Sequence, residues 1–307
     1  MDISLILSNK TTLMILIFAV LILLLFLYSF AEKKMLVTKE YILSSNKLGA
    51  KGKDRAIVVL ADLHNNTFGK NNSRLIKKID QISPDYILIA GDLITKRQPC
   101  SKSHGFSLLQ DLLKKYSIYY GYGNHEQYFQ MDFRDGTDQH EEASQLYRDW
   151  MEYKRALESM GVKFLDNESV TLPEDNLKIT GLTIDRDFFS RGRVQEFPKN
   201  YINSLVGDSD SKRYQILLAH NPVYFHEYCS WGADLTLSGH VHGGLVRLPL
   251  IGGLISPQVR LFPKYSEGSF TKEGKTMVVS RGLGSHSCMI RIFNPPELVI
   301  IRLNRED

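Results

Sequence analysis

Five short apolar runs, each followed at once by potential metal ligands, constrain the fold of this chain more than any other feature. The runs are residues 56–61, 86–90, 118–120, 215–219 and 233–237. Continuous apolar runs of this kind are typical of strands that are buried on both faces. Amphipathic helices are predicted between the early runs, over residues 73–82 and 106–116, and a longer helix over 141–160. Strands that alternate with helices indicate an α/β core, in which polar residues at the strand ends meet at one edge.

The residues after these runs have the chemistry of a metal site. In chain order the motifs are Asp62-Leu63-His64, Gly91-Asp92, Gly123-Asn124-His125-Glu126, His220 and Gly239-His240-Val241-His242. They offer two Asp, one Asn and four His ligands, with a fifth His to spare. Oxygen and imidazole ligands without thiolate suit Mn, Fe, Zn, Co or Ni. Such a set can hold two divalent ions about 4 Å apart, the arrangement that stabilises the attacking and leaving oxygens in phosphoryl transfer.

The N-terminal segment has the length and composition of a membrane span. Residues 11–31 carry no charge, and a helix needs about 20 apolar residues to cross a bilayer. A cleaved signal peptide is the alternative, because Ser29-Phe30-Ala31 places small residues where a signal peptidase cuts. The apolar run is, however, longer than the h-region of about 7–15 residues that signal peptides use. We expect a membrane anchor in residues 1–31, a connector in 32–54 and one catalytic domain in 55–307.

Charge and cysteine content bear on the membrane orientation and on the partners that this chain can bind. Lys33, Lys34 and Lys39 follow the apolar segment and only Lys10 precedes it, which favours a single-pass protein of the cell membrane with a cytoplasmic catalytic domain. The net charge of +4 is small for 307 residues and the basic residues are scattered, which argues against nucleic acid as a partner. The three cysteines lack a CxxC pairing, which argues against a disulfide framework or a thiolate metal site. The sequence leaves the oligomeric state open.

The motifs from Asp62 to His242 resemble those of the calcineurin-like metallophosphoesterases, and the resemblance extends from about residue 56 to the C-terminus. It implies a four-layer αββα sandwich, two β-sheets flanked by helices, with two metal ions at one end. The implied ligands are Asp62, His64, Asp92 and His242 for one ion, and Asp92, Asn124, His220 and His240 for the other. The ions implied are Mn, Fe or Zn, with Mn favoured.

The resemblance also implies a mechanism. Hydroxide that bridges the two ions would attack phosphorus in line with the leaving group, without a covalent protein intermediate. His125 would protonate or stabilise the leaving oxygen, and Glu126 would orient that imidazole as its carboxylate partner.

Two further stretches, residues 245–265 and 280–297, resemble the membrane-associated bacterial phosphohydrolases of this family. The first is a Gly- and Pro-containing apolar loop that follows His242, and it is suited to line a substrate groove, to touch a bilayer or simply to pack. Arg247, Arg281 and His286 are candidate substrate contacts, although either arginine fits a structural ion pair equally well.

The sequence therefore predicts a membrane-anchored, metal-dependent phosphoesterase. Because an anchor keeps the site close to lipid, we expect a phosphodiester or pyrophosphate bond in a lipid-linked or nucleotide–lipid substrate. One alternative is a general phosphodiesterase or phosphatase on soluble substrates. Another is a non-catalytic, membrane-bound interaction module.

Overall fold

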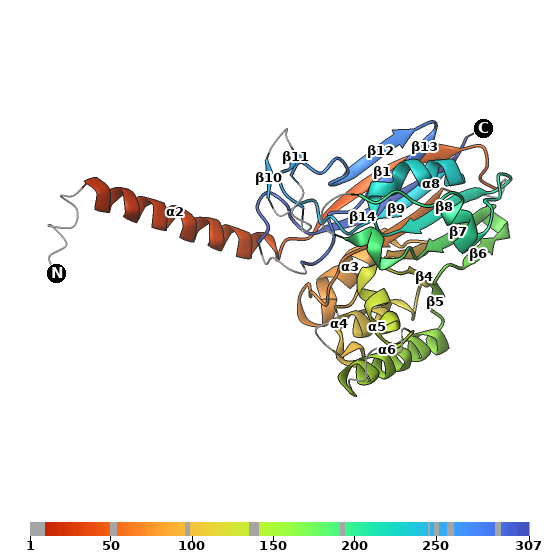
Figure 1. The fold of residues 1–307 in the computed structure, drawn as a ribbon, viewed down its shortest axis with the longest axis horizontal. Coiled ribbons are helices and arrows are strands. Elements are labelled where there is room, and N and C mark those ends of the chain that lie inside the picture. Colours follow the sequence, from red (N-terminus) through yellow and green to blue (C-terminus); the bar gives the residue numbers. More distant parts are fainter. Residues whose placement is uncertain are drawn as a thin grey trace.

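The fold comprises an α/β body and one long helix that projects from it. The computed structural model describes residues 10–49, 54–95, 99–134, 141–190, 194–244, 246–248, 252–256, 261–285 and 290–306. Helix α2 (Lys10–Glu32) extends away from the body (Figure 1). Its segment Thr12–Glu32 is long and apolar enough to cross a membrane, as the sequence predicted.

Two six-stranded mixed sheets make up the body. The first has the order β1 (Val37–Ser45), β14 (Glu297–Arg305), β2 (Arg55–Leu60), β3 (Tyr86–Ala90), β4 (Ser117–Gly121) and β5 (Lys163–Leu165). The second has the order β12 (Gly268–Lys272), β13 (Lys275–Val279), β9 (Leu235–Ser238), β8 (Tyr214–Ala219), β7 (Leu177–Leu182) and β6 (Ser169–Leu172). Strands β2 to β5 run parallel to one another, as do β7, β8, β9 and β13. Their carboxyl ends therefore lie at one edge of each sheet.

Alternating side chains on the central strands build three layers of core. On β2, Val58 and Leu60 face the helices, whereas Ile57 and Val59 face the second sheet. The outer face of the first sheet is covered by α3 (Ser73–Ile82), α4 (His104–Leu112) and α6 (Glu141–Met160). The second sheet is covered by α7 (Tyr201–Val206) and α8 (Phe225–Trp231). This order of helix, sheet, sheet and helix is the four-layer sandwich that the sequence predicted.

The five apolar runs became β2, β3, β4, β8 and β9. Helices α3 and α6 have the predicted bounds, and α6 ends before Gly161, whose φ of +110° a helix cannot continue. Helix α5 (Asn124–Arg134) was not predicted from the sequence; it begins within the third motif. Short 3₁₀ turns and a small hairpin complete the described elements: Lys70–Asn72, Cys100–Lys102, Pro173–Asp175, Arg186–Phe189 and Pro222–Tyr224, with β10 (Arg247–Leu248) and β11 (Gly252–Gly253).

The last turn of α2 is packed against the body. Ser29 and Glu32 are buried, whereas most apolar side chains before them are exposed. The Arg291 backbone N–H donates to Ser29 Oγ at 2.9 Å, and the Tyr28 and Phe293 rings lie 5.4 Å apart. Strand β1 begins soon after the helix and pairs along its whole length with β14. The segment expected as a connector therefore contributes a strand to the first sheet, and α2 is fixed to the body at its base.

Candidate metal centre

Strand ends from both sheets bring the predicted motif residues together. Asp62 follows β2, Asp92 follows β3, His220 follows β8, and His240 follows β9. Their ligand atoms fall into groups within 4.8 Å of one another: Asp62, His64 and His242; His64, Asp92 and His125; Asp92, His220 and His240. Asp62 and His242, which are 180 positions apart, thus share one site.

Two buried carboxylates lie at the centre of the site. Asp62 Oδ1 lies 3.4 Å from His242 Nε2 and 3.7 Å from His64 Nε2. Asp92 Oδ2 lies 3.1 Å from His220 Nε2 and 3.8 Å from His64 Nε2. Within the described part of the chain, neither carboxylate forms an ion pair with a lysine or arginine. Two buried negative charges without such a partner call for a cation.

The histidines and carboxylates perturb one another's pKa values. Burial would raise the pKa of Asp62, but the neighbouring His242, His64 and His220 hold it below its ordinary value. Burial likewise opposes ionisation of Asp92, yet its histidine neighbours, His220 first among them, hold its pKa well below the usual range. Both carboxylates are therefore ionised at neutral pH.

The imidazoles differ in their ionisation. Burial would lower the pKa of His220, but Asp92 raises it to about 10. Burial lowers the pKa of His240 to about 3 and that of His242 to about 4, so both of these rings are neutral at pH 7. Because a metal binds the unprotonated imidazole, a divalent cation competes with the proton at His220 and meets no proton at His240 or His242.

Backbone carbonyls orient two of the rings. His220 Nδ1 lies 2.6 Å from the Ala90 carbonyl oxygen, and His242 Nδ1 lies 3.1 Å from that of Gly284. When Nδ1 donates to these oxygens, Nε2 of each ring carries the lone pair that a metal accepts. Asn124 Oδ1 is buried and accepts no hydrogen bond from the described residues, a state that costs about 1–3 kcal/mol. The donor set therefore fits divalent cations.

The backbone at the site is held in an uncommon conformation. Positive φ values between 47° and 70° occur at Asp62, His64, Asp92, His240 and His242. Such values are uncommon outside glycine and gather at functional sites. Gly123 permits the close approach of two loops, since a Cβ there would lie 2.2 Å from Asp92 Oδ1.

Helix α5 places His125 and Glu126 in its first turn. The His125 backbone N–H donates to Asp92 Oδ1 at 2.8 Å, and its ring packs edge-on against that of His64, with centroids 4.8 Å apart. The buried His125 ring thus lies beside His64 and Asp92 within the site. The role of its ring toward a leaving group stays a prediction.

Glu126 contacts the loops that carry the ligands. Its Oε2 accepts the backbone N–H groups of Asp92 and Gly123, each at 2.9 Å. Its Oε1 accepts the Leu93 N–H at 3.0 Å and the Tyr120 hydroxyl at 2.7 Å. Burial, reinforced by the charge of Asp92, raises the pKa of Glu126. These contacts give Glu126 a part in fixing Asp92; its expected pairing with the His125 ring stays a prediction.

Of the candidate substrate contacts, the two arginines form ion pairs with Glu267. Arg247 Nη2 lies 2.6 Å from Glu267 Oε1, and Arg281 Nε lies 2.9 Å from Glu267 Oε2. This shared ion pair is one of the two alternatives that the sequence left open. A contact of either arginine with phosphate stays a prediction. His286 lies outside the described residues.

Two residues to which the sequence gave no role support His242. The buried Arg291 donates through Nη2 to the Gly284 carbonyl oxygen at 2.6 Å, the same oxygen that His242 Nδ1 contacts. Asn294 Nδ2 donates to the His242 carbonyl oxygen at 2.7 Å. In the sequence, Arg291 stands between two isoleucines, where an exposed charged side chain is unusual, and this pattern is the signal of its burial.

Comparisons with known proteins agree with this geometry. The family model for calcineurin-like phosphoesterases matches residues 55–244. An uncharacterized metallophosphoesterase of Campylobacter jejuni, Cj0846, is 30% identical over 82% of this chain, which spans 59% of that protein's length. UDP-2,3-diacylglucosamine pyrophosphatase LpxG of Chlamydia muridarum is 27% identical, covering 80% of this chain and 82% of LpxG. The uncharacterized metallophosphoesterase YkuE of Bacillus subtilis is 26% identical, covering 89% of this chain and 87% of YkuE.

Proposed function

The chain belongs to the calcineurin-like phosphoesterase family, a family of metal-dependent hydrolases, and we propose that it acts from a membrane on a lipid-linked or nucleotide–lipid substrate. The bond cleaved would be a phosphodiester or a pyrophosphate. The observation that carries this proposal is the fixed joint between an apolar helix and the domain that holds the metal-ligand groups. The likeness to LpxG, whose name gives an acylated nucleotide sugar as its substrate, supports the same class.

The clusters of ligand atoms support two proposed ligand sets. Asp62, His64, Asp92 and His242 would hold one ion, and Asp92, Asn124, His220 and His240 the other. When bound, two divalent cations, with Mn favoured over Fe or Zn, would stabilise the negative charge on the phosphoryl oxygens and lower the pKa of water.

The chain's own residues supply the rest of the mechanism. His125, whose ring packs on that of His64, would hold a proton toward the leaving oxygen. Glu126 would keep the Asp92 loop in place through its backbone contacts.

The packing of α2 supports an uncleaved anchor over a signal peptide. Cleavage after Ala31 would remove the Ser29 contact with Arg291 and the Tyr28 contact with Phe293. It would also separate the buried Glu32 from the helix that precedes it. We therefore place the protein in the cell membrane as a single-pass protein, with the charge bias beside the span favouring a cytoplasmic catalytic domain.

Turnover by the full chain in detergent with added Mn tests the proposal. The substrates are a diacylated UDP-sugar and bis-p-nitrophenyl phosphate, and the proteins are the wild type, Asp92→Ala and the exposed control Asp111→Ala. We expect cleavage of the lipid substrate by the wild type and by the control, and none by Asp92→Ala, whose folding is checked by circular dichroism. Cleavage of the soluble ester alone would overturn the lipid substrate class. Wild-type rates from a folded Asp92→Ala protein would overturn the metal mechanism.

A further inference from the structure

Exposed apolar side chains gather around the β10–β11 hairpin. Beyond α2, the large hydrophobic residues exposed in the described part of the chain are Met35, Ile42, Met160, Val194, Leu248, Leu261, Phe262 and Phe293. Three of these eight, Leu248, Phe262 and Phe293, line one cavity, and Leu261 directly precedes Phe262; these four residues are here called the hairpin rim. Leu261 is 68% exposed, Phe262 63% and Phe293 51%. A patch of this kind on a folded domain marks a site of interaction.

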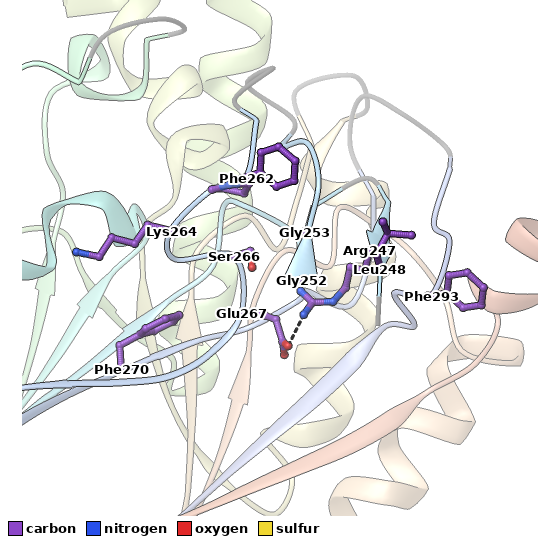
Figure 2. Close-up of a pocket in the computed structure, with 11 residues that line it drawn as sticks. Arg247, Leu248, Gly252, Gly253, Phe262, Lys264, Ser266, Glu267, Phe270 and Phe293 are labelled. Carbon is purple, nitrogen blue, oxygen red and sulfur yellow. Dashed lines mark hydrogen bonds and ion pairs between the residues drawn. The ribbon is translucent and has the colours of Figure 1, made fainter. Parts of the chain in front are cut away.

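The hairpin rim surrounds a cavity of about 630 Å³. Figure 2 shows Phe262 on one side of it, with Leu248 and Phe293 on the other. Its floor includes the Arg247–Glu267 ion pair, and Lys264 contributes a further cation. The surface therefore combines apolar side chains at its edge with charged groups behind them, which is the composition of a surface at a membrane interface.

The hairpin rim begins where α2 leaves the body. Phe293 of the rim lies against Tyr28 in the last turn of that helix, with ring centroids 5.4 Å apart. The Ser29–Arg291 hydrogen bond and the burial of Glu32 hold this turn on the body. Lys34 Nζ lies 5.1 Å from the Phe30 ring, which places a cation at the base of the helix. A bilayer crossed by α2 would thus end beside the hairpin rim.

The same hairpin lies directly behind the metal ligands. Arg247 of β10 donates through Nη1 to the carbonyl oxygen of Gly243, the residue after His242, at 3.1 Å. A Cβ on Gly244 would lie 3.1 Å from the Gly253 Cα, so the turn after His242 packs closely on β11. Only the thickness of this hairpin separates part of the apolar surface from the turn that carries a metal ligand.

We propose that the hairpin rim lies in the headgroup interface of the same bilayer that α2 crosses. The occupant of this surface is lipid, because the rim is continuous with the base of the membrane helix and is joined to it without a flexible tether. The metal centre then meets phosphoesters at the membrane surface, where lipid-linked substrates are concentrated. This inference rests on the proposed anchor, and it adds a second, independent contact between the domain and the membrane.

Tryptophan depth measurements on the full chain in nanodiscs test the inference. Phe262→Trp reports from the hairpin rim, and Met160→Trp, at the exposed end of α6, is the matched control. The native Trp150 and Trp231 are buried, so the wild type supplies the baseline. With lipids brominated near the headgroup, we expect emission of Phe262→Trp to fall by about half, as for a side chain that enters the acyl boundary, and that of the control to stay unchanged.

The outcomes separate the two proposals. If emission from Phe262→Trp is as insensitive to bromolipid as that from Met160→Trp, the proposed bilayer contact is refuted. A tryptophan side chain in Phe262→Trp that is buried from water but not quenched by bromolipid would indicate a protein partner and would also refute it. Leu261→Trp gives the same reading if Phe262→Trp does not fold. Quenching in samples that hydrolyse neither a diacylated UDP-sugar nor bis-p-nitrophenyl phosphate would uphold the membrane surface and refute the proposed function alone.

Discussion

Substitution of Glu126 by Gln separates two roles for this residue. The carboxylate accepts five hydrogen bonds, from the N–H groups of Asp92, Leu93, Ile94 and Gly123 and from the Tyr120 hydroxyl. A carboxamide has one acceptor oxygen, so its NH₂ group would face at least one backbone N–H. A rotamer that turns the NH₂ group toward Tyr120, whose hydroxyl can accept, leaves the Leu93 and Ile94 N–H groups without this acceptor. An unsatisfied buried donor and the weaker neutral bonds together cost about 2–4 kcal/mol.

Chemical denaturation and Mn titration calorimetry measure this effect. We expect Glu126→Gln to lower the free energy of unfolding by that amount and to weaken Mn binding by about tenfold or more, since residues behind metal ligands tune affinity. His125→Ala should keep both properties and lose about 10²–10⁴ in kcat, as for loss of a general acid. The exposed Glu152→Gln should stay within about 0.5 kcal/mol of the wild type. If Glu126→Gln keeps its stability and Mn affinity but loses turnover as His125→Ala does, Glu126 acts on the imidazole and our reasoning is refuted.

Three further predictions address the supports of the site. Arg291→Met should lower the free energy of unfolding by about 3–5 kcal/mol and weaken Mn binding, because it removes the hydrogen-bond donor of several buried carbonyl oxygens. The control Arg302→Met, on the surface, should change neither property. Equal effects of the two substitutions would contradict this account. Deletion of residues 1–31 should lower the thermal midpoint, and an unchanged midpoint would show that the α2 joint does not stabilise the domain. Removal of Mn with a chelator should also lower the midpoint, since ligand at 100 times Kd adds about 2.7 kcal/mol; an unchanged midpoint would show that Mn is not bound at working concentrations.

The strand ends could be predicted from the sequence because their signals are local. A run such as Ile57-Val58-Val59-Leu60 is buried on both faces wherever it sits in a layered α/β fold, and the Asp62 that follows must leave the sheet. The order of motifs along the chain then indicated one site, and the clusters of ligand atoms around Asp62 and Asp92 agree with it. The strand order of the two sheets had no such local signal.

Glu126 shows where local reasoning was insufficient. The sequence suggested that it orients its neighbour His125, and that role stays a prediction. The structure adds contacts that the motif does not reveal, because the Glu126 carboxylate accepts the backbone N–H groups of Asp92 and Leu93. Asp92 lies 34 residues away along the chain, so no local pattern signals this contact.

The joint of α2 had no local signal at all, because Ser29 and Arg291 are 262 residues apart. Yet this contact connects the proposed membrane anchor with the residues behind the metal site. Ser29 accepts from the Arg291 backbone, the Arg291 guanidinium holds the Gly284 carbonyl, and that carbonyl orients His242. A buried arginine that cannot find water must keep these partners, so displacement of the helix base is costly at the same residue that supports a metal ligand. The apolar helix therefore contributes to the structure of the domain that holds the metal site. We expect its removal to weaken the Arg291 contacts that orient His242.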